Sequence, residues 1–146
     1  MASSEETTEA GLPGIGRRLI GMLYEFILLI GVVAAAVVVP NLILALASGI
    51  VLPRPALRVY VFLVLAAYFL WQWRGGRQTL AMRTWKLRIT SRSGGAPTLS
   101  QLALRYVLAW PSIALLGIGI LWALVDRDRQ FLHDRLAGTR IIFSTP

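Results

Sequence analysis

The sequence contains no cysteine, a single histidine and only seven acidic residues among its 146 amino acids. Without cysteine there are no disulfide bonds and no thiolate chemistry. One histidine with scattered carboxylates gives too few ligands, and no recognised spacing, for a metal site. Charge is also scarce, because 15% of the residues are charged whereas soluble domains average about 25%. These shortages argue against a metalloprotein and against an ordinary soluble domain.

Apolar residues are abundant, at 56% of the chain with a mean hydropathy of +0.65. Apolar segments occupy residues 19–39, 56–73 and 102–125, and the first can be extended past Pro40 to residue 46. The first two are close to the roughly 20 residues that cross a bilayer core. The length allows one domain. We expect an all-α polytopic membrane protein with two transmembrane helices and a third apolar segment that spans or re-enters the membrane.

The terminal regions differ from this apolar body. Residues 1–16 are acidic and then rich in glycine and proline, so we expect a disordered cytoplasmic tail there. The membrane domain is expected at residues 17–143, and residues 144–146 form a short tail. The start lacks the basic residues of a secretory signal, and the first apolar run is too long for a signal core.

Basic residues orient the chain. The net charge is +8, and residues 74–105 hold seven basic residues and no acid. By the positive-inside rule this stretch and the N-terminus are cytoplasmic, while the short connection at 48–58 lies outside. The basic residues of the stretch 74–105 are candidates for binding anionic lipid headgroups, at about 1 kcal/mol each near the surface. Candidates for headgroup binding or for a polar network are Arg83, Arg88 and Arg105. The sequence predicts no groove-reading motif for nucleic acid.

Two short segments have strand patterning. Residues 85–90 alternate polar and apolar side chains before a Ser-Gly-Gly turn, and residues 139–143 are a second strand candidate. A lone strand is marginal, so we expect a small cytoplasmic β element in which the two pair. Pairing requires both on one side of the membrane, which favours a third segment that enters and returns, broken at Pro111 or at residues 117–119. The alternative is three plain crossings with the C-terminus outside.

Glu25 lies inside the first apolar segment, where a carboxylate costs roughly 2.5–3.5 kcal/mol on insertion scales. Arg18 is on the same helix face, but a separation of about 10 Å along the axis makes direct pairing unexpected. Glu25 therefore needs another polar partner. The candidates are Arg83, Arg105, His133, Asn41 and Gln72. Its role is either a structural intramembrane contact or the binding of a proton or cation.

A second polar cluster follows the third segment and contains His133 and Asp134. Adjacent residues on a helix do not face each other, so Asp134 is expected to pair with an arginine of the basic stretch or to cap a short helix. His133 can titrate near neutral pH, although a lone histidine is more often structural. Ser112 has no histidine nearby to activate it. We expect no catalytic residues, no cofactor and no enzymatic activity.

Several sequence blocks, in order, resemble the RDD family of small integral membrane proteins. Residues 17–25 resemble its opening helix, 76–83 its GQTLGKR stretch, 86–89 the strand that follows, and 121–139 its closing signature. The resemblance covers about residues 16–143, and the closing block is the most specific part.

The family is named for one arginine and two aspartates, which fall on Arg18, Glu25 and Asp134. Glu25 departs from the family's aspartate but keeps its charge. The resemblance implies proteins proposed to transport unidentified ligands, with cation/proton exchange suggested for some members.

These observations predict a small multi-pass protein of the bacterial cytoplasmic (inner) membrane that transports an unknown substrate or exchanges ions and protons. Candidate residues for binding substrate, ion or proton are Glu25, Arg18, Asp134 and His133. Expected partners are the anionic bilayer and either further copies of the chain or another membrane protein. The alternative is a non-catalytic adaptor or assembly factor in which Arg18, Glu25 and Asp134 form a structural polar lock. An enzyme acting on a lipid-linked substrate ranks last.

Overall fold

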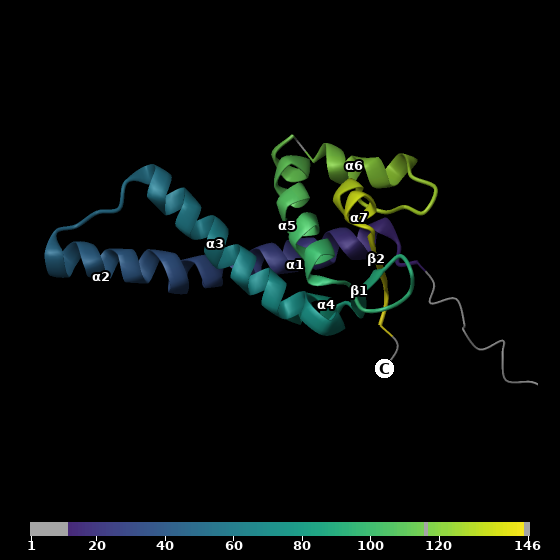
Figure 1. Cartoon of the computed structure of the whole chain (residues 1–146), viewed down its shortest axis with the longest axis horizontal. Coiled ribbons are helices and arrows are strands. Elements are labelled where there is room, and N and C mark those ends of the chain that lie inside the picture. The colour runs from purple at the N-terminus through teal and green to yellow at the C-terminus, as the bar shows by residue number, and fades with distance from the viewer. Residues whose placement is uncertain (1–11, 116, 145–146) are drawn as a thin grey trace, which may run out of the picture.

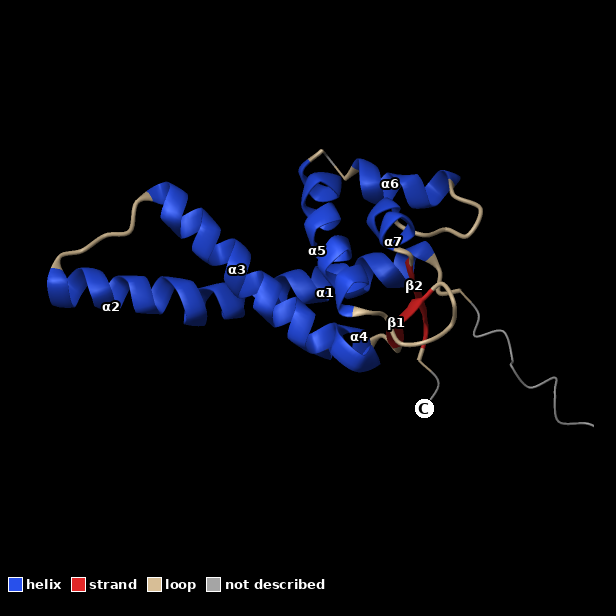
Figure 2. Cartoon of the chain, in the orientation of Figure 1, coloured by secondary structure: helices blue, strands red, loops and turns tan. Residues whose placement is uncertain are grey.

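The computed structural model describes residues 12–115 and 117–144. The predicted tails fall largely at residues 1–11 and 145–146, outside the described residues. The described chain is mostly helical with one small sheet, as Figure 2 shows. The first helix begins at Ile15, two residues inside the segment that we expected to be tail.

The first apolar segment forms one continuous helix of 34 residues. It comprises α1 (Ile15–Val33), a π-helical turn η1 (Ala34–Val38) and α2 (Val39–Ser48). At about 1.5 Å per residue it is about 50 Å long, which exceeds the roughly 30 Å of a bilayer core. The extension past Pro40 that the sequence left open is therefore present.

Pro40 is accommodated within this helix. Proline has no N–H, so the carbonyl four residues earlier, on Ala36, loses its usual donor. The hydroxyl of Tyr60, on α3 (Arg54–Trp73), donates to that carbonyl at 2.8 Å. The Asn41 side chain donates to the Val37 carbonyl at 2.8 Å. Side-chain hydroxyl and amide donors thus satisfy carbonyls of the irregular turn, as a low-dielectric environment requires.

The second apolar segment, α3, returns along the first and leads into a short turn η2 (Arg74–Gly76) and helix α4 (Leu80–Thr84). In Figure 1 the end of α2 and the start of α3 project as a hairpin away from the rest of the molecule. Its large apolar side chains are exposed, for example Leu46 at 79% and Val51 at 76%. Exposed apolar helices of this length are expected where a protein faces lipid.

The third apolar segment is broken. Helices α5 (Leu99–Ala114) and α6 (Ile118–Val125) are bent by 97° relative to each other. The break falls at Gly117, which has a φ of +74° that favours glycine. Pro111, the other expected breakpoint, lies inside α5. Among the described residues, two helices are long and apolar enough to cross a membrane, and the bent pair makes a third if α5 and α6 form one span.

The two predicted strands pair. Strand β1 (Leu87–Ser91) and strand β2 (Thr139–Phe143) form an antiparallel sheet in which Ile89 lies opposite Ile141. The first strand begins two residues later than expected, because Lys86 has a φ of +53° that an extended strand does not allow. The short helix α7 (Leu132–Ala137) precedes β2. Because β1 precedes α5 and β2 follows α6, their pairing brings together the two ends of the broken third segment.

The best-packed core lies beside this sheet, where α3, α5, α6 and α7 converge. Leu102 is fully buried, and Ile89 and Phe131 are each 1% exposed. Figure 1 shows these elements gathered around one end of α1 and α3, opposite the projecting hairpin. Polar side chains of the first helix therefore enter the core at this end.

Candidate functional site

A buried ion pair joins α5 to α7. Asp134 lies in the first turn of α7 and is 0% exposed. The Arg105 Nε donates to its Oδ1, and the Arg105 guanidinium lies 4.4 Å over the Trp73 ring. Thr139 Oγ1 lies 3.3 Å from the Asp134 main-chain carbonyl, to which it donates. Asp134 thus pairs with an arginine of the basic stretch, as the sequence predicted.

Electrostatics hold Asp134 in its charged form. Burial alone would raise the pKa of this carboxyl, but the Arg105 charge and hydrogen bond, together with the charges of His133 and Arg18, keep the pKa below its ordinary 3.8. Within the described residues, Oδ2 of Asp134 has no hydrogen-bond partner. The charge of Arg18 also acts on this carboxylate.

His133 is buried next to this pair at 4% exposure. Its ring stacks on Phe131 with centroids 5.6 Å apart, and its Nε2 is 3.9 Å from Asp134 Oδ1. Burial lowers the pKa of His133 below 6.5, and Arg105 lowers it further while Asp134 opposes the change. The ring is therefore held neutral at neutral pH.

Arg18 enters the same region from α1 and is 1% exposed. Its Nη1 donates to the main-chain carbonyl of Arg129, a residue with a φ of +51° that is uncommon outside glycine. Its guanidinium lies 6.0 Å from the Phe131 ring centroid. Within the described residues, Nε and Nη2 of Arg18 have no hydrogen-bond partner. One edge of a buried guanidinium is therefore unsatisfied.

Glu25 has different partners from those expected. The Tyr68 hydroxyl donates to its Oε1 at 3.0 Å and the Thr79 hydroxyl to its Oε2 at 2.5 Å. Thr79 also caps α4, because its Oγ1 accepts from the Met82 N–H at 3.2 Å. Of the candidates proposed from sequence, Arg105 binds Asp134 and the Asn41 side chain donates to the Val37 carbonyl. Two hydroxyls, rather than a charge, hold this carboxylate.

A cleft of about 870 Å³ lies between α1, α3 and α5 and contains these groups at one end. Its apolar walls include Leu29 and Val33 of α1, Leu65 and Phe69 of α3, and Ile113 of α5. Its charged or titratable lining residues are Arg18, Glu25, Arg105, Tyr106 and His133. The cleft therefore has a long apolar part and a polar end near the sheet.

A family model described as the RDD family matches residues 12–138. The chain belongs to the RDD family. No curated protein and no solved structure matches it. Family membership and the long apolar helices together indicate a membrane protein.

In this RDD protein the three residues of the family pattern form two groups. Arg18 and Asp134 share the buried cluster beside the sheet, whereas Glu25 lies further along α1 with Tyr68 and Thr79. Arg18, Glu25 and His133 line the cleft, and the Asp134 carboxylate holds Arg105 at its edge.

Arg83 and Arg88, predicted as headgroup or network residues, are both exposed and lie outside this RDD cleft. Sequence reasoning missed Tyr68, Thr79 and the Arg129 carbonyl. A tyrosine within an apolar helix was the available signal for Tyr68, since a hydroxyl there needs a partner. In the described part of the chain, no three or more metal-ligating residues lie close enough to hold a metal ion.

Proposed function

We propose that this RDD protein is a small transporter or ion/proton exchanger of the bacterial cytoplasmic membrane, with Glu25 as its ion- or proton-binding carboxylate. The observation that carries this is the cleft, in which one intramembrane carboxylate faces a space of about 870 Å³. A carboxylate held only by neutral hydroxyls has no permanent counter-charge, so a cation or a proton can supply it.

The two hydroxyls give Glu25 a defined geometry for this role. Tyr68 on α3 and Thr79 at the start of α4 each donate to one carboxylate oxygen. Binding of a proton converts one oxygen to a donor and disturbs one of these contacts. Because the donors lie on different elements, protonation of Glu25 is coupled to how α1 packs against α3 and α4.

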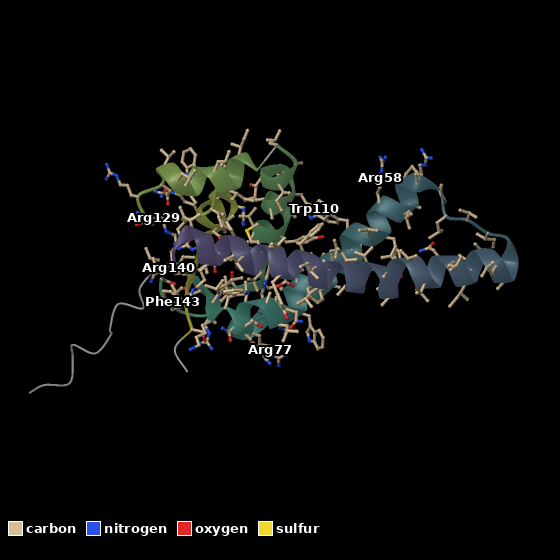
Figure 3. All side chains as sticks on the ribbon, turned by 180° about the vertical axis from the view of Figure 1, so that it is seen from behind. Arg58, Arg77, Trp110, Arg129, Arg140 and Phe143 are labelled. Atoms are coloured by element: carbon tan, nitrogen blue, oxygen red, sulfur yellow. The ribbon has the colours of Figure 1, made fainter. Side chains whose placement is uncertain are left out.

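A single copy does not enclose a pathway, since the cleft opens at exposed residues such as Phe26 and Ile30. We therefore propose a homo-oligomer in the membrane. The sheet supports a third segment that re-enters, with both termini cytoplasmic. Figure 3 shows Arg129 and Arg140 at the sheet end and Arg58 on the projecting hairpin, an arrangement that fits cytoplasmic placement of the more basic end.

The test is ion flux in vesicles reconstituted with the full chain. Vesicles loaded with a pH-sensitive dye are given a Na⁺ or K⁺ gradient, and proton movement is followed. Glu25→Gln keeps the side-chain volume and one acceptor oxygen, so it should fold normally and lose at least about tenfold of the flux. The matched control is Asp128→Asn, an exposed carboxylate outside the cleft, which should leave flux unchanged. Equal flux in wild type and Glu25→Gln rules out the role.

A second function, a non-catalytic adaptor held by a polar lock, is favoured by a separate observation. The Arg105–Asp134 pair joins α5 to α7, and the Glu25 contacts join α1 to α3 and α4. In that case the polar residues hold the helices in the arrangement that another membrane protein binds. Vesicles would then show no flux, while Glu25→Gln would lower stability or assembly.

The lock is tested by Asp134→Asn, which leaves the buried Arg105 charge unpaired at a cost of about 3–5 kcal/mol. Arg88→Gln is the control, because Arg88 is exposed on β1 and its loss leaves no buried charge unpaired, so the change should stay within about 0.5 kcal/mol. Thermal unfolding in mild detergent measures both. A melting temperature for Asp134→Asn equal to that of the control rejects the lock.

A further inference from the structure

We propose that the cleft binds one anionic phospholipid, with the phosphate on the free edge of Arg18 and an acyl chain along the apolar walls. This deepens the proposed function by naming a ligand class for the same cleft. It rests on that function only to the extent that both use this cleft. It also differs from headgroup contact at the exposed basic surface, because the headgroup lies at a buried arginine.

The polar end of the cleft is suited to an anion. Arg18 is 1% exposed, and its Nε and Nη2 have no partner in the described residues. These two nitrogens form one edge of the guanidinium, the edge that binds two oxygens of a phosphate in parallel. A buried cation with unused donors is unfavourable until an acceptor reaches it.

Nearby carboxylates do not supply that acceptor. Asp134 accepts from Arg105 with Oδ1 and acts on Arg18 through its charge, but its Oδ2 has no hydrogen-bond partner in the described residues. Glu25 accepts from Tyr68 and Thr79. Glu25 is also about 10 Å from Arg18 along the helix axis. Arg105 is paired with Asp134 and His133 is neutral. Among the described residues that line the cleft, the cation with buried, unpaired donors is therefore Arg18, and these donors favour an anionic headgroup over a cationic one.

The rest of the cleft is suited to hydrocarbon. Leu29, Val33, Phe69 and Ile113 line it, and pockets of roughly 300–1,000 Å³ accommodate one extended organic ligand. Phe26 and Ile30 border the opening and are 62% and 58% exposed. Because these residues lie on a helix long and apolar enough to span the membrane, the opening faces the bilayer. A lipid can enter from there without passing through water.

Other occupants fit less well. An apolar helix of a second copy could cover the walls, but it would leave the Arg18 donors bare. A small inorganic anion could satisfy Arg18 but would leave the apolar walls empty. An anionic amphiphile is the class that satisfies both ends of the cleft.

The experiment is native mass spectrometry of the full chain in mild detergent, titrated with phosphatidylglycerol, phosphatidylcholine of the same acyl chains, or inorganic phosphate. We expect one tightly bound phosphatidylglycerol, retained at a concentration at least about tenfold lower than phosphatidylcholine requires. Ala109→Trp fills the cleft from α5 and should abolish this adduct. Val107→Trp, on the same helix but 51% exposed and outside the cleft, should retain it.

Further variants separate the headgroup site from the basic surface. Arg18→Lys keeps the charge and loses the paired donors, so selectivity for phosphatidylglycerol should fall; thermal unfolding shows whether it folds. The double variant Arg83→Gln with Arg88→Gln should keep the tight adduct. Equal binding of both lipids, an adduct unaffected by Ala109→Trp, or equal retention of phosphate alone overturns the inference. So does a dimer that Ala109→Trp dissociates without any change in lipid binding.

These results are independent of transport. Glu25→Gln should still bind phosphatidylglycerol, because the headgroup contact is at Arg18. A selective adduct without ion flux in vesicles leaves this inference standing and removes the proposed function. Flux that depends on Glu25, without a selective adduct, does the reverse.

Discussion

Individual charged residues in this protein are stabilised in unequal ways. Asp134 has an arginine at short range, Glu25 has two hydroxyls, and Arg18 has one carbonyl and an aromatic face. Both oxygens of Glu25 therefore accept hydrogen bonds, one oxygen of Asp134 does, and two of the three Arg18 nitrogens have no partner in the described residues. The unsatisfied nitrogens of Arg18 are the reason for proposing that an anionic headgroup binds there, since a ligand would supply the missing hydrogen bonds.

At the residue scale, stability should depend on pH through His133. Its pKa is 6.5 when unfolded and lower when folded, so below that pH the unfolded chain takes up a proton that the folded protein does not. We expect the melting temperature to fall as the pH is lowered from about 7.5 to about 5.5, the range over which histidine titrates. The measurement is thermal unfolding in detergent at intermediate pH values.

His133→Gln should flatten this dependence. Asp134 does not contribute in the same range, because its pKa lies below 3.8 and its stabilisation is lost only in stronger acid. The charged groups acting on the ring are Arg105 of α5 and Asp134 of α7. An unchanged slope in His133→Gln would show that another group titrates.

At the scale of elements, the long first helix depends on α3 where Pro40 interrupts it. Tyr60→Phe removes the donor to the Ala36 carbonyl and should cost about 1 kcal/mol, a typical value for a hydrogen bond between membrane helices. In a Pro40→Ala background the restored N–H can reach that carbonyl, so the cost of Tyr60→Phe should shrink. The control is Tyr24→Phe, since Tyr24 has no hydrogen bond among the described residues.

The packing of α6 on α5 depends on Gly119. A Cβ there would lie 2.4 Å from the Ser112 Cβ, so Gly119→Ala must displace one helix at a cost of about 1–3 kcal/mol. Gly31→Ala is the control, because nothing lies within 4 Å of its added Cβ, and alanine there should be neutral or stabilising by up to about 1 kcal/mol. Thermal unfolding compares the two, and Ser112→Gly should partly rescue Gly119→Ala. Equal melting temperatures for the two alanine variants would contradict the close contact.

The elements themselves were largely predictable from sequence. Apolar run length predicted the helices, and polar–apolar alternation together with the need for a partner predicted that residues 85–90 pair with 139–143. The break at 117–119 was one of two expected, and Pro111 was the wrong one because a helix tolerates proline when one backbone acceptor is left unused. Helices and strands could be predicted because each depends mainly on the pattern of polar and apolar residues within its own segment.

The contacts of the site were less predictable. Asp134 was expected either to pair with an arginine of the basic stretch or to cap a short helix, and it pairs with Arg105. Tyr68 and Thr79 were missed, since they lie 43 and 54 residues from Glu25 and only the packing of α1 against α3 and α4 brings them close. The partner of Arg18 is a main-chain carbonyl, that of Arg129. Every residue has such a carbonyl, so nothing in the sequence distinguishes this one as the acceptor.

At the scale of the whole molecule, the sheet predicts the side of the membrane that each loop occupies. The chain has no cysteine, so single cysteines can report exposure to a membrane-impermeant maleimide in intact cells. Val51→Cys, between α2 and α3, should react from outside. Ser93→Cys, after β1, and Arg127→Cys, between α6 and α7, should react only after permeabilisation. Reaction of Arg127→Cys from outside would mean that α5 and α6 cross the membrane, and would separate the two strands.

The bond from Arg18 to the Arg129 carbonyl spans 111 residues of sequence, and this has a consequence for biogenesis. When α1 first reaches the bilayer, the loop that will receive its arginine has not been synthesised. Until residue 129 has been translated this acceptor is missing, so we expect the Arg18 cation to stay near the membrane interface, where water solvates it. Chains that stop before this loop would lack the acceptor and leave a buried cation without this hydrogen bond, so we expect them to be less stable than the full chain.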